Sequence, residues 1–186
     1  TSLGLMESVA RAVERLGELA DSAAVSRLAA AFSAAGHELA LVGGSVRDAF
    51  LNRDLTDLDF TTSARPDDIL ALVTPISDVQ WDVGRDFGTI AARINGLTVE
   101  ITTYRADAYD GETRKPIVQF GDTLEDDLVR RDFTVNAMAL RLPERQLVDP
   151  WGGLDDLLAR HDFGAVLHFA GELPARRDGN VQLQRG

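Results

Sequence analysis

The chain has 186 residues, of which 45% are hydrophobic, and this is enough to bury one compact core. It contains no cysteine, which excludes a disulfide framework, a thiolate zinc site and a cysteine nucleophile. The formal net charge of −11 argues against a surface that grips nucleic acid unaided, although it is compatible with a small cationic site inside an acidic shell. No apolar run approaches the roughly 18–20 residues of a membrane span, and the N-terminus lacks a signal-peptide pattern. We therefore expect a soluble, cytoplasmic protein without a membrane partner.

The first part of the chain alternates between helical and extended patterns. Residues 6–35 carry apolar side chains at helical spacing and Gly36 follows as a stop, which predicts two short helices within an N-terminal segment over residues 1–36. Residues 38–42 predict a buried strand, and residues 45–51 predict a helix that begins just after a glycine pair. Leu58 and Phe60 then alternate with two aspartates, the period of a strand with one wet face.

The second part of the chain predicts a hairpin and three further helices. Proline and two carboxylates at 66–68 are typical of a helix start. Residues 89–94 and 97–104 predict two strands joined at Asn95-Gly96, and a loop is expected over 106–116. Residues 124–131 predict a helix capped by Asp122 or Thr123, and residues 154–159 predict another. Since the hairpin excludes a purely parallel sheet, we predict a mixed α/β domain over residues 37–159.

Residues 160–186 differ in character from the rest of the chain. They mix short apolar patches with glycines and show no sustained period. His161 and His168 lie seven apart without acidic partners, which does not favour a metal site. We expect a divergent, poorly ordered tail.

A glycine pair lies between the predicted strand at 38–42 and the helix that follows. Gly43, Gly44 and Ser45 allow the backbone to pass close to a ligand with amide groups aimed at an anion. Arg47 and Asp48 come on the first turn of the helix, where an arginine could reach the same anion. An ordinary strand-to-helix turn with a surface ion pair is the alternative. Neither a dinucleotide fingerprint nor a P-loop is present, because the required third glycine and Lys-Ser or Lys-Thr pair are missing.

Two aspartates on the next predicted strand give a sharper signal. Asp57 and Asp59 are two apart, so their side chains point to the same face, and a shared divalent cation such as Mg²⁺ would relieve their repulsion. A solvated edge strand is the alternative. Glu100, between two apolar neighbours in the predicted 97–104 strand, is a candidate third carboxylate that faces either the metal or water.

Five segments in order resemble a known family. "LVGGSVRD", "DLDF", "VEITTYRAD", "LEDDLVRRDFTVNAMAL" and "LVDPWGGLDDL" are similar to successive motifs of the head domain of class II tRNA nucleotidyltransferases. This family comprises the CCA-adding enzymes and bacterial poly(A) polymerases of the polymerase-β-like superfamily, and the resemblance runs from about Leu41 to Leu157. Each motif alone is modestly specific, whereas five in sequence are very specific.

The resemblance implies a mixed-sheet nucleotidyltransferase head that transfers CMP or AMP from CTP or ATP to the 3′ hydroxyl of tRNA with two Mg²⁺. In this sequence, Gly44 and Arg47 would hold the triphosphate and Asp57 and Asp59 would ligate the metals. The resemblance also assigns a nucleotide-binding role to a later segment, with phosphate or base for the arginines and the sugar for the others: Arg130, Arg131, Asp132 and Asn136. An ion-paired helix end is the alternative for this last segment.

Beyond residue 160 the resemblance ends. The Asp-Asp-Pro-Leu-Arg stretch, the helical neck that selects the base, and the body and tail regions that hold tRNA have no counterpart here. We therefore expect a truncated catalytic head that binds tRNA weakly and exposes apolar surface that favours self-association. A non-catalytic nucleotide- and metal-binding remnant is the alternative function, and a poly(A) polymerase is the alternative enzyme.

Overall fold

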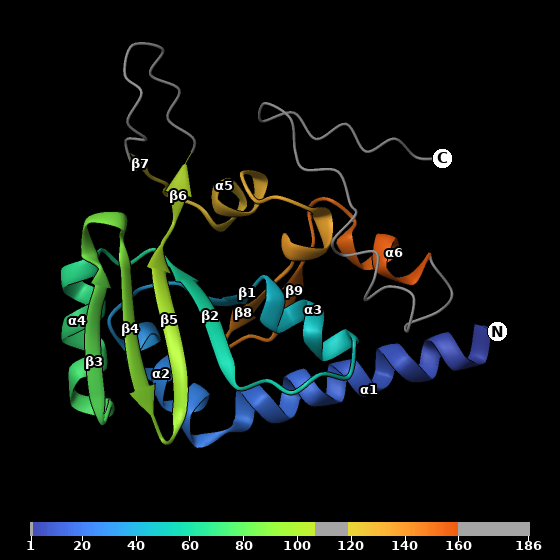
Figure 1. Ribbon diagram of the computed structural model, residues 1–186, viewed down its shortest axis with the longest axis horizontal. Helices are drawn as coiled ribbons and strands as arrows, with labels where there is room; N and C mark the ends of the chain where they lie inside the picture. The colour runs from blue at the N-terminus through green and yellow to red at the C-terminus, as the bar shows by residue number, and fades with distance from the viewer. Residues whose placement is uncertain (1, 107–118, 160–186) are drawn as a thin grey trace, which may run out of the picture.

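The protein, described here from a computed structural model over residues 2–106 and 119–159, is built around one large sheet (Figure 1). The sheet has seven strands in the order β3-β4-β5-β2-β1-β8-β9, and β6 and β7 form a separate two-stranded ribbon. The strands are β1 Leu39–Val42, β2 Asp57–Thr62, β3 Val79–Gly84, β4 Thr89–Ile94, β5 Leu97–Thr103, β6 Arg105–Ala106, β7 Gln119–Phe120, β8 Ala139–Leu142 and β9 Gln146–Val148. The α-helices are α1 Ser2–Asp21, α2 Ala23–Ala34, α3 Gly44–Phe50, α4 Pro66–Val73, α5 Leu124–Val129 and α6 Gly153–Leu158.

The large sheet is mixed, as the sequence predicts. Strands β2 and β5 run parallel, and the other neighbouring pairs in the sheet are antiparallel. Strands β4 and β5 form the predicted hairpin, with Asn95 and Gly96 at φ values of 48° and 81° in its turn. Two consecutive positive φ values are the geometry that an Asn-Gly turn favours. The predicted mixed α/β fold is therefore confirmed.

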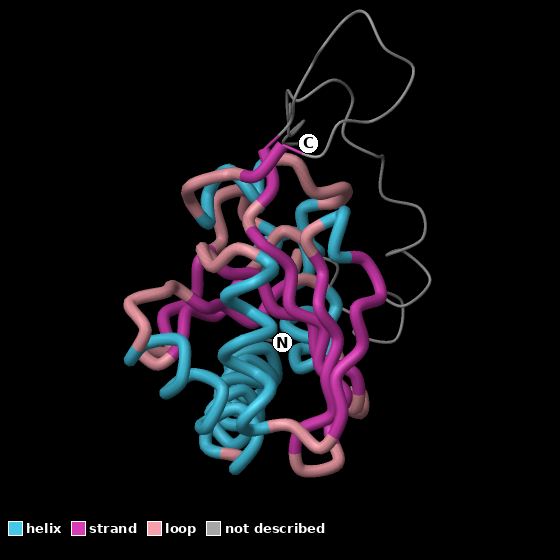
Figure 2. Tube along the Cα trace, turned by 90° about the vertical axis from the view of Figure 1, so that its left-hand side faces the viewer, coloured by secondary structure: helices cyan, strands magenta, loops and turns pink. Residues whose placement is uncertain are grey.

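Most of the helices gather on one side of the strands (Figure 2), and the main hydrophobic core lies between these helices and the sheet, whereas α5 packs on the other side. Leu58 and Phe60 of β2 face this core, as do Val99 and Ile101 of β5. Because side chains alternate along a strand, the residues between them face the other side of the sheet. A smaller cluster on that second side packs Leu128 of α5 and its neighbours against β1 and β8.

The predicted helices are all present, but the first is longer than expected and α5 ends at Val129 rather than at residue 131. Helix α1 has 20 residues and begins at Ser2, so the first helix is not short. Ser22 ends it and caps α2, because its hydroxyl accepts a hydrogen bond from the Val25 amide. Thr123, rather than Asp122, caps α5 by accepting from the Asp126 amide. None of the helices in the described ranges is long and apolar enough to cross a membrane.

The sequence analysis did not predict strands β3, β8 and β9. Strand β3 contains a register shift between Trp81 and Gly84, and β8 and β9 have four and three residues, too short for a period-two pattern to stand out. Of the loop expected over 106–116, Ala106 pairs with Gln119 in the small ribbon, and the rest lies outside the described residues. The predicted tail, with its two histidines, also lies outside them.

Candidate functional site

The two predicted metal ligands lie side by side on the second face of the sheet. Asp57 and Asp59 are exposed, whereas Leu58 between them is buried in the main core. Glu100 of β5 pairs in register with Asp59, and strand neighbours in register point the same way. Glu100 therefore faces the aspartates rather than away from them. Within residues 2–106 and 119–159, no three acidic or histidine side chains converge closely enough to hold a metal ion. The aspartate pair therefore remains the predicted donor set.

The carboxylate of Asp59 is electrostatically crowded. Its pKa is raised above the ordinary value of 3.8, first because surrounding atoms partly desolvate it and second because Glu100 lies close by. Asp57 adds to this rise, and Arg131 opposes it. Crowded carboxylates on an accessible strand are a donor set that suits Mg²⁺, which takes one or two protein carboxylates and completes its shell with water and substrate phosphates. The residues present therefore fit a divalent cation.

The glycine pair brings backbone close to an arginine. Gly43 has φ 68° and ψ −129°, a conformation that side-chain-bearing residues rarely adopt, and its amide donates to the Met138 carbonyl at 3.2 Å. A Cβ atom at Gly43 would lie 3.5 Å from Nη1 of Arg131, and one at Gly44 would lie 3.4 Å from Nη2 of Arg47. Two guanidinium groups therefore approach this turn, which makes it suitable for an anion.

Arg47 joins two segments that are far apart in the sequence. Its Nη1 donates to Oδ1 of Asn136 at 2.6 Å, and its Nε donates to Oδ1 of Asp48 at 3.0 Å. Asp48 also contacts Arg53, at 3.4 Å. The structure thus brings Arg47, Asp48 and Asn136 together. Asp48 orients the guanidinium of Arg47 through this Nε hydrogen bond.

Ser45 links the glycine turn to the aspartate strand. Its side chain is buried, donates to the Asp57 carbonyl at 3.4 Å and accepts from the Asp59 amide at 3.2 Å. The hydroxyl is therefore engaged with the backbone of β2, and it fixes the distance between the turn and both carboxylates. This linking role was not evident from the sequence, which suggested a contact with the ligand.

A buried carboxylate that the sequence analysis missed anchors the arginine pair. Asp127 is fully buried, and its Oδ2 accepts from Nε and Nη2 of Arg131 at 3.2 and 2.9 Å. Its Oδ1 lies 3.5 Å from Nε of Arg130 and accepts from the Arg105 amide at 3.0 Å. The spacing of three and four residues between Asp127 and the two arginines is the signal that could have revealed it. The ion-paired helix end is therefore present, and it still leaves Arg131 close to both Gly43 and Asp59.

Arg105 lies close to Arg130 and Arg131, and the three arginines form a cationic cluster around Asp127. Nη2 of Arg105 donates to the Phe87 carbonyl at 2.7 Å and to the Thr89 hydroxyl at 3.3 Å. Burial lowers the pKa of Arg105 from the ordinary value, and the charge of Arg130 lowers it further. Asp132 is exposed beside the cluster. Three arginines around one buried aspartate leave a net positive region within a chain of net negative charge.

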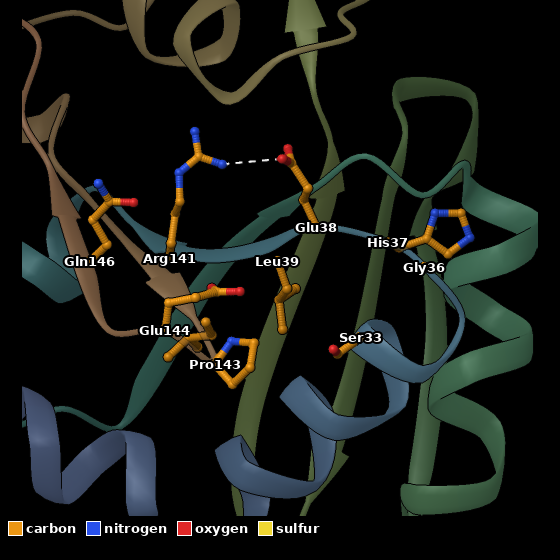
Figure 3. Close-up of a pocket in the computed structure, with 10 residues that line it drawn as sticks. Ser33, Gly36, His37, Glu38, Leu39, Arg141, Pro143, Glu144 and Gln146 are labelled. Atoms are coloured by element: carbon orange, nitrogen blue, oxygen red, sulfur yellow. Dashed lines mark hydrogen bonds and ion pairs between the residues drawn. The ribbon is translucent and has the colours of Figure 1, made fainter.

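A pocket of about 450 Å³ lies at the other end of β1 (Figure 3). Its lining includes Glu38 and Arg141, whose side chains pair at 3.2 Å, and Pro143. Glu38 also accepts from the buried Tyr104 hydroxyl at 2.9 Å, which raises the pKa of Tyr104 after the larger effect of its burial. The pocket begins where β1 starts, whereas the glycine turn follows its last residue, about 13 Å along the strand. None of the candidate site residues lines it.

The comparisons with known proteins agree on one family. The model of the poly A polymerase head domain family matches residues 39–161. The CCA-adding enzyme of Streptococcus gordonii (strain Challis) is 45% identical over 156 residues, which are 82% of this chain and 36% of that protein. The CCA-adding enzyme of Bacillus licheniformis is 43% identical over 126 residues, 67% of this chain and 30% of that protein. The chain therefore spans about a third of the length of the curated relatives it matches.

Solved structures agree with the sequence comparison. The Bacillus stearothermophilus CCA-adding enzyme in complex with CTP superposes with a TM-score of 0.59 and 34% identity, over 72% of this chain and 30% of that one. The Thermotoga maritima CCA-adding enzyme complexed with tRNA gives a TM-score of 0.53 and 29% identity, over 70% and 29%.

Proposed function

The chain belongs to the poly A polymerase head domain family, and we propose that it is the catalytic head of a template-independent tRNA nucleotidyltransferase. It transfers CMP and AMP from CTP and ATP to the 3′ end of tRNA. The observation that carries this proposal is the exposed pair Asp57 and Asp59, held beside the Gly43 turn and within the field of Arg131. Carboxylates for a metal and cations for a triphosphate thus meet at one place on the sheet.

The metal ligands are Asp57 and Asp59. They would hold Mg²⁺, which would supply Lewis-acid chemistry there: a lower pKa for the primer hydroxyl and neutralised charge on the departing pyrophosphate. Glu100 faces the same region without completing a three-carboxylate set, so its part is electrostatic. Its negative charge and that of Asp57 raise the proton affinity of Asp59, and both charges therefore increase the site's demand for a cation.

The triphosphate is held by backbone and guanidinium groups. Gly43 and Gly44 permit close approach of the backbone, and Arg47 reaches the same turn. Asp48 orients Arg47 by accepting a hydrogen bond from the Nε of Arg47. Ser45 fixes the turn against β2 through its hydrogen bond to the Asp57 carbonyl. These contacts hold the turn and Arg47 in fixed positions relative to β2, and such preorganised groups stabilise charge effectively.

The arginine pair and its neighbours hold the rest of the nucleotide. Arg130 and Arg131, fixed by Asp127, offer positive charge to phosphates, while Asp132 and Asn136 lie near the sugar. The primer 3′ oxygen attacks the α-phosphorus, a new phosphodiester bond forms, and the bond to pyrophosphate breaks. The chain contributes orientation and electrostatic stabilisation rather than a covalent intermediate.

Transfer of AMP alone, as in a poly(A) polymerase, is the alternative reaction of this same site. The names of the relatives described above favour CCA addition. Since the chain carries a formal net charge of −11, long-range electrostatic attraction contributes little to its binding of the 3′ end of tRNA.

Incorporation of labelled CMP and AMP onto a tRNA that lacks CCA, in Mg²⁺, tests the proposal. An Asp59→Ala variant, verified as folded by circular dichroism, is the matched control. We expect incorporation by the native chain and its loss in the variant, and the ratio of CMP to AMP separates CCA addition from A addition. A folded chain that incorporates neither nucleotide would instead be a non-catalytic nucleotide-binding remnant.

A further inference from the structure

An exposed tryptophan lies in the same row of the sheet as the aspartates. Strand pairing places Trp81 of β3 opposite Ala91 of β4, Ala91 opposite Glu100 of β5, and Glu100 beside Asp59 of β2. Residues paired in register point to the same face. Three strand spacings of about 4.8 Å separate the Trp81 and Asp59 backbones by about 14 Å.

This face of β3, β4 and β5 is opposite to the helices. The core-facing residues of β4 are Ile90, Ala92 and Ile94, so the residues between them face the second side. Figure 1 shows α2 and α4 behind these strands, on the core side. Trp81 is 42% exposed there, an unusual state for the largest aromatic side chain.

The groups around Trp81 suit a nucleic acid strand. Arg93 is exposed and lies in the adjacent row, where it pairs with Val79 on one side and Thr98 on the other. Thr98 in turn pairs with Asp57, so this second row also leads to the metal ligands. An aromatic ring for a base and a guanidinium for a phosphate are the two elements of a single-strand binding surface.

We propose that Trp81 is a stacking platform for an unpaired base of the RNA primer. The inference rests on the proposed function, because the position of the reacting 3′ hydroxyl is set by the aspartates. Since Trp81 lies three strands away from them, it stacks on a base that precedes the terminal nucleotide. Ala91, which lies between the two in the row, is only 4% exposed, so the RNA contacts in this row are made by Trp81 and at the aspartates rather than by Ala91. Arg93 meets a phosphate of the same segment.

The occupant is RNA rather than a protein surface because the row is continuous with the metal site and carries Arg93. Stacking is also tolerant of sequence, since every base has a π-face. This suits an enzyme whose primer end changes with each addition.

The test uses the full chain and a tRNA acceptor minihelix that ends in CC. Trp81→Ala removes the platform, and Trp81→Phe keeps an aromatic face. Phe87→Ala, at an exposed aromatic in the 85–87 connection between β3 and β4 and outside the row, is the matched control. We expect Trp81→Ala to raise the KM for the minihelix roughly 5- to 30-fold with the KM for nucleotide unchanged. Trp81→Phe and Phe87→Ala stay close to the native value.

Minihelices with one abasic nucleotide near the 3′ end identify the stacked base. At one position, loss of the base raises KM for the native chain and has no further effect on Trp81→Ala, a coupling that a merely structural role would not produce. An unchanged minihelix KM in Trp81→Ala, or an equal rise in the nucleotide KM, overturns the proposal.

A binding measurement separates this proposal from the proposed function. In a Trp151→Phe background Trp81 is the sole tryptophan, and the minihelix should quench its fluorescence saturably. Quenching without incorporation supports the platform while counting against catalysis, and absence of quenching overturns the platform whether or not the chain is active. Sedimentation that shows a dimer in the native chain and a monomer in Trp81→Ala would also overturn it, because a second copy would then cover the ring.

Discussion

Replacement of Asp127 by asparagine tests whether one buried carboxylate organises the cationic side of the site. The native carboxylate accepts two hydrogen bonds from Arg131, lies 3.5 Å from Nε of Arg130 and accepts from the Arg105 amide. An asparagine of the same shape keeps one acceptor and turns its amide hydrogens toward the guanidinium donors. Removing one partner of a buried ion pair costs about 3–5 kcal/mol of unfolding free energy.

The expected loss of unfolding free energy in Asp127→Asn lies toward the lower end of the roughly 3–5 kcal/mol range, because the side chains of Arg130 and Arg131 are 22% and 23% exposed. Asp127 itself is fully buried. A loss of about 3 kcal/mol lowers the melting temperature of a chain of this size by about 6–12 °C. Asp126→Asn is the matched control, since it makes the same change on the same helix at an exposed position and should cost at most about 1 kcal/mol.

Thermal denaturation and CTP binding provide the assays. We expect Asp127→Asn to melt well below Asp126→Asn and to bind CTP more weakly, because Arg131 loses its fixed orientation. A double-mutant cycle with Arg131→Gln should show coupling, since each change removes the same contact. Equal melting temperatures for the two asparagine variants would refute the anchoring role of Asp127.

Three further variants probe the other side of the site. Asp59→Asn should raise the melting temperature of the metal-free protein at neutral pH, because the raised pKa of Asp59 means that its ionised form destabilises the fold. This gain should shrink as the pH falls toward 3.8, and a gain that persists in acid would contradict it. Gly43→Ala should cost about 1–3 kcal/mol and weaken CTP binding, because φ is 68° and ψ is −129° there; unchanged melting and affinity would count against a strained turn. Ser45→Ala should cost about 1–2 kcal/mol and raise the Mg²⁺ concentration needed for incorporation, and an unaltered Mg²⁺ titration would dismiss its linking role.

Local patterns in the sequence were sufficient to predict most of the fold. The alternation around Asp57 and Asp59, the Asn95-Gly96 turn and the proline at the start of α4 each depend on neighbours in the chain. Strands β8 and β9 could not be predicted in this way, because β8 is defined by its pairing with β1, a contact between residues about a hundred positions apart. Strand β3 was missed because its register shift breaks the alternation.

The candidate site was predictable as a set of residues but not as an arrangement. The motifs named Arg47 and Asn136 separately, and their hydrogen bond depends on how α3 packs near the 134–136 turn. The direction of Glu100 was open from the sequence, and the parallel pairing of β2 with β5 decided it. Asp127 was overlooked because one acidic residue among three at a helix start gives no sign of burial until the arginines fold over it.

Metal binding at the aspartate pair is the most direct test of the central claim. Mn²⁺ is titrated into the chain with CTP present and followed by electron paramagnetic resonance, with Asp59→Asn and the exposed-site variant Asp126→Asn alongside. The account predicts tight, CTP-dependent Mn²⁺ binding in the native chain and in Asp126→Asn, and its loss in Asp59→Asn. Equal binding by all three proteins would place the metal elsewhere and contradict the assignment of Asp57 and Asp59 as its ligands.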